Sequence, residues 1–516
     1  MSAPTKKLPN SRGASAPHPS MKREVADTIK WSLIDKVATQ VLYAVTGIVL
    51  ARMLSHDDFG LVGAILVFQA FANLFVDSGF SSALIQRKAP TRLDYSTVMW
   101  FNIAMAVAIY IILFFCAPLI AGWFQGDERL IPLSRVMFLS FILSATAIVP
   151  TNRLMKQMQV RMIAVANSIG LTAGAITGIW LAVAGYGAWA IVWQTIALSA
   201  VKSIVLWATT SWRPLWSFSW TALKSFFSVG MGVMGASLLN TVFLNIYSFF
   251  IGNRAGMASL GLYTQADKWS KMGIMSIGQS LVQAFLPPLS QIQDDPTEFG
   301  RATAKMNRCA AYLTFPALGL LAVMATPIFH LFFGTKWDAS IVLFQILLLR
   351  GVFTVLSMVF NNYILALGKS RMLLVSETLR DGVAIAAIIP TLGSLALTSG
   401  TDITLGIRIF LWGQVAATAV GCIATMQIAA RYTSRTIWHM LWDLAPYIPL
   451  TLAAMAAAHY LPHLTATLLP QWQWLTHPAA ILPQQLLAAS TVYLSLNTLL
   501  GSQIQRQALT YLHPHK

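Results

Sequence analysis

Long runs of apolar residues follow one another along most of the chain, and short polar segments separate them. A helix that crosses a bilayer needs about 20 consecutive, mostly apolar residues, so each run predicts one membrane-spanning helix. The predicted spans are residues 30–52, 59–86, 95–122, 130–150, 160–184, 187–209, 224–251, 258–289, 306–333, 339–366, 370–392, 403–429, 440–460 and 478–500. The pattern therefore predicts an all-α integral membrane protein with about 14 transmembrane helices.

The composition agrees with a chain that is surrounded largely by lipid. Of the 516 residues, 56% are hydrophobic and only 10% are charged, whereas soluble proteins carry about 25% charged residues. So few charged side chains could not cover the surface of a soluble protein of this size. The three cysteines, Cys116, Cys309 and Cys422, have no spacing typical of a disulfide framework or a metal site, so no bound metal is expected.

The distribution of basic residues predicts how the chain is oriented in the membrane. A net charge of +17 is compatible with a nucleic-acid partner, or with the excess of Lys and Arg that cytoplasmic loops carry. Alternating the predicted loops between the two sides places 23 basic residues on one side and four on the other, namely Arg52, Arg129, Arg254 and Lys336. This asymmetry predicts that both termini are cytoplasmic, and it argues against a nucleic-acid partner.

Two similar segments indicate an internal repeat. "VLARMLSHDDFGLVGA" (49–64) and "FIGNRAGMASLGLYTQ" (250–265) each place a basic residue at a helix end, followed by a short turn, a glycine and an apolar helix. Arg52 and Gly60 would correspond to Arg254 and Gly261, and six predicted helices fit into the offset of about 200 residues. Parallel repeats related by an axis along the membrane normal occur in transporters that bind substrate between their halves.

The repeat and the helix pattern together predict the domain organisation. It comprises a disordered cytoplasmic tail (1–27), an N-terminal six-helix bundle (28–210), a cytoplasmic linker (211–223), a C-terminal six-helix bundle (224–430), two additional transmembrane helices (440–500) and a second cytoplasmic tail (501–516). The two bundles are expected to be related by a pseudo-two-fold axis along the membrane normal. Because the loops are short, the function is expected to reside within the membrane.

Polar residues recur every three or four positions on several predicted spans, which gives each of these helices one polar face. Gln69, Asn73 and Asp77 share a face of the second span, and Asn245 belongs to such a face on the seventh. Hydrogen bonds between helices, worth about 0.6–2 kcal/mol each, would explain single polar residues. A charged side chain costs about 2.5–3.5 kcal/mol at the bilayer centre, so intramembrane charges indicate functional sites.

The eighth predicted span carries the densest group of charges. Tyr263, Asp267 and Lys271 share one face, and Lys268 lies on an adjacent face with Gln279. Asp267 can pair with Lys271 at i, i+4, which leaves Lys268 uncompensated. Lys268 is therefore the sharpest single candidate for a functional residue.

Other intramembrane charges also lack a partner nearby in sequence. Glu377 and Arg380 can pair at i, i+3. Left without an obvious local partner are Asp77, Arg135, Lys202, Lys268 or Lys271, Arg350 and Arg408. Because most of these residues are basic, they predict a cationic cavity suited to an anionic, sugar-bearing substrate.

These faces and charges define the candidate site residues. Substrate binding is expected of Arg52, Arg254, Lys268, Arg350, Gln69, Asn73, Asn245 and Gln279. If transport is coupled to H⁺ or Na⁺, the candidate carboxylates are Asp77, Asp267 and Glu377, because a semi-buried carboxylate can have a raised pKa. No catalytic residue and no cofactor is predicted, and the loosely spaced His459, His463 and His477 are interpreted as interfacial residues.

Two regions carry motifs of a known family. The first joins "ARMLSHDDFGLVGAI" to "LVFQAFANLFVDSGFSSALIQRK", and the second is "LGLYTQADKWSKMGIMSIGQSLVQAFLPPLSQIQDD". Both resemble the polysaccharide flippases (Wzx/WzxC-like, PST branch) of the MOP exporter superfamily. The first region matches the family pattern at Asp58-Phe59-Gly60 and departs from it at His56, where the family usually has proline. The second region places Lys268 on the lysine of the family motif.

The resemblance implies a fold and a task. The fold is two six-helix bundles around a central cavity, with two peripheral helices. The task is translocation of an undecaprenyl-diphosphate-linked oligosaccharide from the cytoplasmic to the periplasmic leaflet of the bacterial inner membrane, by alternating access. O-antigen, capsule or exopolysaccharide biosynthesis would use this step, with a polysaccharide polymerase and other assembly proteins as further partners.

Three alternatives remain open at this point. Within the superfamily they are a lipid II flippase, which shares the fourteen helices and a cationic lumen, and a multidrug exporter, whose cavity should be predominantly acidic. From another class, the rival is an integral-membrane polysaccharide polymerase or ligase. Such an enzyme usually carries its catalytic groups on a large periplasmic segment, and the predicted periplasmic loops are short.

Overall fold

The computed structural model describes residues 19–77, 80–397, 404–469, 471–502 and 504–506, and within these residues all regular structure is helical. The N-terminal half contains α1 (Pro19–Met53), α2 (His56–Asp77), α3 (Phe80–Gln86), α4 (Arg92–Trp123), α5 (Leu130–Met137), α6 (Leu139–Lys156), α7 (Val160–Val183) and α8 (Trp189–Thr209).

The C-terminal half begins with a helix of 72 residues, α9 (Trp220–Gln291). It continues with α10 (Pro296–Val323), α11 (Ala325–Phe332), the short 3₁₀ helix η1 (Thr335–Trp337), α12 (Asp338–Ala366), α13 (Ser370–Thr391), η2 (Leu392–Ala396) and α14 (Leu405–Tyr432). The remaining elements are α15 (Ile437–Leu444), α16 (Tyr447–Leu468), η3 (Gln473–Thr476) and α17 (Pro478–Leu499).

The first helix is longer than the sequence predicts. It begins at Pro19, inside the segment 1–27 interpreted as a disordered tail, whereas residues 1–18 lie outside the described part of the chain. Once the apolar part of a helix has formed, each further residue adds one hydrogen bond without a new nucleation cost. Residues 19–27 therefore extend the first predicted span rather than belonging to the tail.

The long helix α9 contains two predicted spans, 224–251 and 258–289. Gly256 separates them, with the non-helical dihedral angles φ 86° and ψ 176°. A positive φ is costly for residues with a side chain, so this glycine permits the bend. We refer to residues 220–255 as the first arm of α9 and to residues 257–291 as its second arm.

Several predicted spans are interrupted. The span 130–150 falls in α5 and α6, 306–333 falls in α10 and α11, and 440–460 falls in α15 and α16. The span 59–86 includes α2 and α3, and residues 78–79 between them lie outside the described part of the chain. At Phe138, between α5 and α6, the backbone keeps near-helical angles (φ −67°, ψ −16°). Apolar side chains continue on both sides of these breaks, so hydropathy alone does not reveal them.

Eleven stretches of the described chain are long and apolar enough to cross a membrane. The three other predicted spans are the two arms of α9 and the helix α13, which carries four charged residues. The protein is thus an all-helical, multi-spanning membrane protein, and the total of fourteen stays a prediction.

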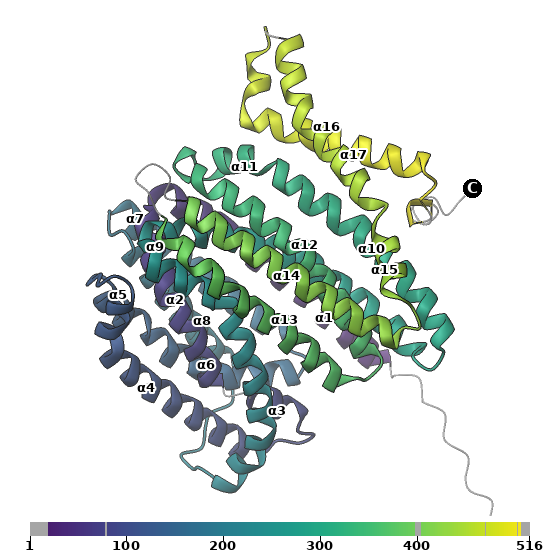
Figure 1. The fold of residues 1–516 in the computed structure, drawn as a ribbon. Coiled ribbons are helices and arrows are strands. Elements are labelled where there is room, and N and C mark those ends of the chain that lie inside the picture. The colour runs from purple at the N-terminus through teal and green to yellow at the C-terminus, as the bar shows by residue number, and fades with distance from the viewer. Residues whose placement is uncertain (1–18, 78–79, 398–403, 470, 503, 507–516) are drawn as a thin grey trace, which may run out of the picture.

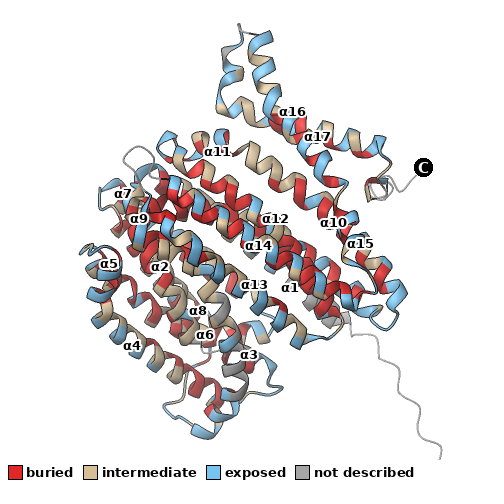
Figure 2. Ribbon diagram, in the orientation of Figure 1, coloured by how far each residue is buried: buried red, intermediate tan, exposed pale blue. Residues whose placement is uncertain are grey.

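The two halves form helix bundles that lie side by side (Figure 1). In the first half α7 packs on α8 and α1, and α4 packs on α6; in the second half α12 packs on α9 and α14, and α13 packs on α14. The hairpin of α16 and α17 lies against α10 and α11 and projects away from the bundles (Figure 1). Much of its surface is exposed (Figure 2), with 22% of the apolar window of α17 buried against 56% for α2.

The two bundles meet where α2 crosses the second arm of α9. A side-chain carbon added to Gly60 would lie 1.9 Å from the carbonyl oxygen of Met257, and one added to Gly261 would lie 1.9 Å from that of His56. The same offset of 201 positions relates Gly60 to Gly261 and His56 to Met257. Reciprocal contacts of this kind are what a two-fold axis produces, so the crossing lies on the pseudo-symmetry axis of the repeat.

Candidate functional site

The end of α1 is joined to the C-terminal bundle through α11. Arg52 Nε donates to the carbonyl oxygen of Phe332 at 2.8 Å, and its Nη2 donates to that of Leu331. The last carbonyl groups of a helix have no partner within the helix, and a positive charge there is also favoured by the helix dipole. Arg52 therefore caps the C-terminal end of α11.

The C-terminal bundle caps α1 in return. Lys336 Nζ donates to the carbonyl oxygens of Arg52 at 2.9 Å and Leu54 at 2.7 Å. The indole nitrogen of Trp337 donates to the carbonyl oxygen of Ala51 at 2.9 Å, and its side chain is fully buried. The two bundles thus exchange caps next to the α2–α9 crossing. We call this region, residues 51–64, 252–264 and 331–337, the closed end.

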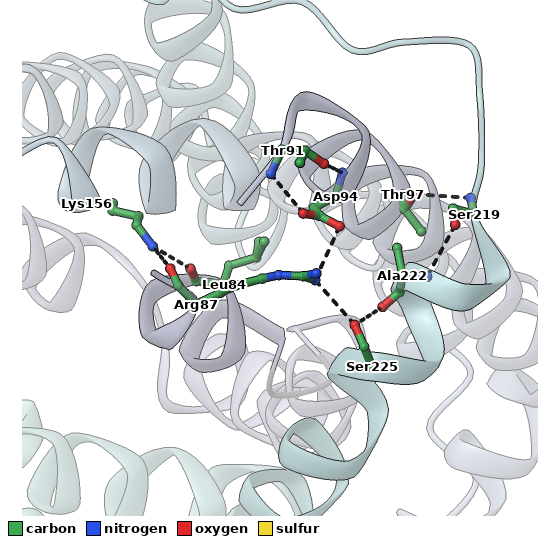
Figure 3. A network of polar contacts seen from close by, with 9 residues as sticks. All are labelled: Leu84, Arg87, Thr91, Asp94, Thr97, Lys156, Ser219, Ala222 and Ser225. Carbon is green, nitrogen blue, oxygen red and sulfur yellow. Dashed lines mark hydrogen bonds and ion pairs between the residues drawn. The ribbon is translucent and has the colours of Figure 1, made fainter. Parts of the chain in front are cut away.

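A polar network joins the bundles at a different place, where α9 begins (Figure 3). Arg87, just after α3, donates to Asp94 Oδ1 and to Ser225 Oγ, both at 3.3 Å. Lys156 from α6 donates to the carbonyl oxygens of Leu84 at 3.2 Å and of Arg87, which caps α3 (Figure 3). The beginning of α9 is therefore attached to the N-terminal bundle, although the rest of the helix belongs to the second half.

A polar cavity of about 470 Å³ lies inside the C-terminal bundle, between α9, α12, α13 and α14. Its polar lining consists of Ser237, Tyr247, Lys271, Arg350, Thr354, Glu377, Thr378, Arg380, Asp381, Gln414 and Thr418. Of the residues that the sequence proposes for the site, this cavity contains Arg350 and Glu377. We call it the C-terminal cavity.

Asp267 holds two of the cations at the C-terminal cavity. Its carboxylate lies 2.6 Å from Lys271 Nζ and 3.4 Å from Arg350 Nη2, and Asp267 itself is buried. The pair with Lys271 is the i, i+4 contact that the sequence predicts. Arg350, which has no partner nearby in the sequence, reaches the same carboxylate from α12.

The third cation of the C-terminal cavity is paired differently from the prediction. Arg380 contacts its neighbour Asp381 at 3.0 Å, and no ion pair in the described part of the chain includes Glu377. The i, i+3 spacing allows the predicted Glu377–Arg380 pair, but the flexible guanidinium reaches the adjacent carboxylate instead. The acidic groups at this cavity and its border are Asp267, Glu377 and Asp381, and the basic groups are Lys271, Arg350 and Arg380. Their charges balance, so the predicted excess of positive charge is not found in this cavity.

Lys268 points in another direction, towards α1. Its Nζ lies 5.2 Å from the centre of the Trp269 ring, and a side-chain carbon added to Gly47 of α1 would lie 2.6 Å from it. Gly47 leaves space for this ammonium group because it has no side chain. Lys268 has no hydrogen bond or ion pair to the residues that the structure describes. It is thus an uncompensated cation at the boundary between the bundles.

The other proposed residues are dispersed rather than gathered in one site. Gln69 Nε2 donates to Ser140 Oγ at 3.3 Å, and Asn245 Nδ2 donates to the carbonyl oxygen of Thr241 at 2.8 Å. The first contact joins α2 to α6 and matches the alternative of hydrogen bonds between helices, whereas the second lies within α9. Asn73, Gln279 and Arg254 are exposed, and the side chain of Asp77 lies outside the described residues.

Sequence reasoning overlooked Tyr247 and Lys271 as cavity residues. Tyr247 is buried on the first arm of α9, and its hydroxyl donates to the carbonyl oxygen of Ala384 at 3.0 Å. Its position in the polar stripe of the seventh span, between Asn245 and Ser248, was the available signal. Lys271 was assigned to a structural pair, yet it also lines the C-terminal cavity.

Comparison with solved structures identifies the fold. The lipid II flippase MurJ, in an inward closed conformation, superposes with a TM-score of 0.70 and 13% identity, covering 92% of this chain and 98% of that one. An inward-facing multidrug resistance transporter of the MATE family, from the MOP superfamily, superposes with a TM-score of 0.57 and 17% identity, covering 79% and 94%. The chain therefore has the fold of the MOP superfamily transporters.

The sequence comparisons identify the family within that class. Residues 49–342, more than half of the chain, match the family described as polysaccharide biosynthesis protein, and the chain belongs to this family. The teichuronic acid biosynthesis protein TuaB of Bacillus subtilis is 26% identical over 77% of this chain and 83% of its own length. The succinoglycan biosynthesis transport protein ExoT of Rhizobium meliloti is 26% identical over 68% and 71%, and the lipopolysaccharide biosynthesis protein WzxC of Escherichia coli is 25% identical over 64% and 68%.

Proposed function

We propose that the protein translocates an oligosaccharide linked to undecaprenyl diphosphate from the cytoplasmic to the periplasmic leaflet of the bacterial inner membrane. O-antigen, capsule or exopolysaccharide biosynthesis would use this step. The observation that carries the proposal is the family match over residues 49–342. A relative named as a succinoglycan transport protein supports a glycan as the transported group.

Alternating access is the proposed mechanism, and the closed end supports it. In the topology predicted from the basic residues, Arg52, Arg254 and Lys336 are periplasmic and both termini are cytoplasmic. The exchanged caps and the glycine crossing would then close the pathway towards the periplasm. We therefore assign Arg52 to closure of the pathway rather than to direct contact with substrate.

Lys268 is the residue proposed to attract the diphosphate. It lies at the boundary between the bundles, on the α1 side of α9, and it has no ionic partner among the described residues. Its side chain is exposed rather than enclosed by the helices, so the ammonium group is accessible, and a passing diphosphate would supply a charge-assisted contact. Arg350 is already neutralised by Asp267, so it would act only if that pair opened during transport.

Coupling to H⁺ or Na⁺ is a separate part of the proposal. Asp267 and Glu377 both belong to the C-terminal cavity or its charged border, and Glu377 has no ion pair within the described residues. Glu377 is therefore the preferred site for a coupling cation. Flipping by the purified protein in vesicles without any ion gradient would show that coupling is not needed.

The decisive experiment measures flipping of a fluorescent undecaprenyl-diphosphate oligosaccharide in proteoliposomes. A charge-assisted hydrogen bond contributes about 1.5–3 kcal/mol, which corresponds to about a 10- to 100-fold change in affinity. Lys268→Met is expected to reduce the rate of transport at low substrate concentration by about this factor. Lys268→Arg keeps the positive charge and should retain most of the wild-type transport rate. Lys305→Met, an exposed lysine on α10, is the matched control. Equal flipping by Lys268→Met and the wild type would refute the role of Lys268.

The alternatives predict different results in the same preparation and in cells. Rescue of a strain that lacks its lipid II flippase, without restored capsule or O-antigen export, would identify lipid II as the substrate. Export of cationic drugs in place of the glycan would indicate a multidrug exporter. Sugar transfer by the purified protein, with no flipping, would indicate an enzyme of the polymerase or ligase class.

A further inference from the structure

A second polar cavity, of about 320 Å³, lies inside the N-terminal bundle between α3, α6 and α8. Six of its nine lining residues are polar, namely Ser81, Ser144, Thr151, Asn152, Ser199 and Lys202. None of the lining residues is acidic. This composition differs from the C-terminal cavity, where carboxylates neutralise the basic groups.

Lys202 carries the charge of this cavity. No hydrogen bond or ion pair joins it to the residues that the structure describes. A side-chain carbon added to Gly170 of α7 would lie only 2.9 Å from Lys202 Cβ, so α7 packs closely against the base of the side chain. An ammonium group held within a bundle without a carboxylate in direct contact is costly, which favours a bound partner.

One acidic group, Asp35 of α1, interacts electrostatically with Lys202 but makes its direct contacts elsewhere. Its two carboxylate oxygens each accept from Asn167 Nδ2 at 3.2 Å, and one also accepts from Thr39 Oγ1 at 3.5 Å. It makes no ion pair with Lys202 within 4.0 Å. Asp35 lowers the cost of the half-buried ammonium but does not occupy its hydrogen-bond donors.

The neighbouring side chains add neutral donors to the ammonium. Ser144 Oγ donates to Ser199 Oγ at 3.4 Å, which leaves the proton of Ser199 for another acceptor. Asn152 Nδ2 donates to Ser81 Oγ at 2.7 Å, which fixes the wall of the cavity. An ammonium group with adjacent hydroxyl donors suits a carboxylate or phosphate oxygen and offers no carboxylate to a metal cation.

We propose that this cavity is an anion-binding site, in which Lys202 and Ser199 bind an oxyanion of a small molecule. Cavities that bind small molecules span about 300–1,000 Å³, so 320 Å³ accommodates a single acidic group or one sugar acid rather than an oligosaccharide. The oxyanion belongs either to a free anion or to an acidic sugar of the transported glycan. The site is separate from Lys268 and does not depend on the proposed function.

Binding by the full-length protein in nanodiscs tests the proposal directly. The probes are glucuronate, inorganic diphosphate and, as a neutral control, glucose, measured by isothermal titration calorimetry. Loss of a charge-assisted contact corresponds to about a 10-fold or greater loss of affinity. Lys202→Met should therefore bind the preferred acidic probe at least about 10-fold more weakly, Lys202→Arg should retain binding, and glucose should not bind.

Two control variants and one control measurement distinguish an anion-binding lysine from a purely structural one. Lys305→Met, which changes an exposed lysine on α10 outside both proposed sites, should bind the probe as the wild type does. Asp35→Asn should bind at least as tightly, because it removes a nearby negative charge. Without ligand, Lys202→Met should melt at the same temperature as the wild type or higher, because an uncompensated cation is removed.

Three outcomes would overturn the proposal. The first is that neither glucuronate nor diphosphate binds to the wild type. The second is that Lys202→Met binds the probe as tightly as the wild type does. The third is that Lys202→Met and Asp35→Asn both lose stability. The last result would show that Lys202 serves as the structural partner of Asp35. A preference for glucuronate would identify an acidic sugar as the source of the oxyanion, whereas a preference for diphosphate would identify a phosphate group.

Discussion

At the residue scale, the charges within the bundles fall into two groups that differ in their partners. Asp267 is shared by Lys271 and Arg350, and Arg380 is matched by Asp381. These groups stabilise the C-terminal bundle because each buried charge has a counter-ion. Lys268 and Lys202 have no such partner among the described residues, and the proposed functions rest on them.

Removing the shared carboxylate should destabilise the protein. Asp267→Asn leaves Lys271 and Arg350 without their counter-ion, and the loss of one partner from a buried ion pair costs about 3–5 kcal/mol. The melting temperature of the purified protein in detergent should fall clearly. The double variant Asp267→Asn/Arg350→Met removes the more buried of the stranded cations, so it should regain part of the loss. An unchanged melting temperature for Asp267→Asn would contradict this account.

At the element scale, the crossing of α2 with the second arm of α9 depends on glycine. The backbones approach so closely at Gly60 and Gly261 that no side chain fits between them. Helix interfaces in membranes commonly use small residues in this way, because close packing replaces the hydrophobic driving force. The sequence pattern marked the two glycines as repeat equivalents, but it did not show that they meet.

A methyl group at Gly261 should disturb this crossing. In Gly261→Ala the added carbon would lie 1.9 Å from the carbonyl oxygen of His56, so the helices must separate and the melting temperature should fall. The matched control is Gly382→Ala on α13, where no atom lies within 4 Å of the added carbon. That change should be neutral or stabilising by about 0.5–1 kcal/mol, the usual helix preference of Ala over Gly. Equal melting of the two variants would refute the close contact.

At the scale of the whole molecule, the closed end joins the bundles through groups from both repeats. Arg52 caps α11 and Lys336 caps α1, so neither cap can be lost without exposing helix carbonyl groups of the other bundle. The beginning of α9 is attached to the N-terminal bundle by Arg87 and Ser225, near the linker (Figure 3). Any movement of one bundle against the other must therefore break the first set of contacts or bend α9.

Loss of both caps should loosen the closed end without unfolding the bundles. In the double variant Arg52→Gln/Lys336→Met, hydrogen–deuterium exchange should rise in peptides 49–56 and 331–337 and stay unchanged within α12. Arg129→Gln is the control, because Arg129 pairs locally with Asp127 at 2.7 Å. If exchange at the closed end did not change in the double variant, the caps would not hold the bundles together.

The sequence by itself determined the features that depend on local pattern. Apolar runs of bilayer length identified the membrane class and most helices, and the i, i+4 spacing identified the Asp267–Lys271 pair. Two similar turns indicated the repeat that the α2–α9 crossing displays. These features follow from the residues of one or two helices, so they can be deduced before any packing is known.

Only the tertiary structure decided which helices became neighbours. Arg350 meets Asp267 from another helix, and Arg52 reaches α11 across 280 positions of the chain. It also separated the cations with partners, such as Lys271, from those without described partners, such as Lys202 and Lys268. Hydropathy and spacing describe one helix at a time, whereas these contacts depend on how helices cross and in which direction each side chain points.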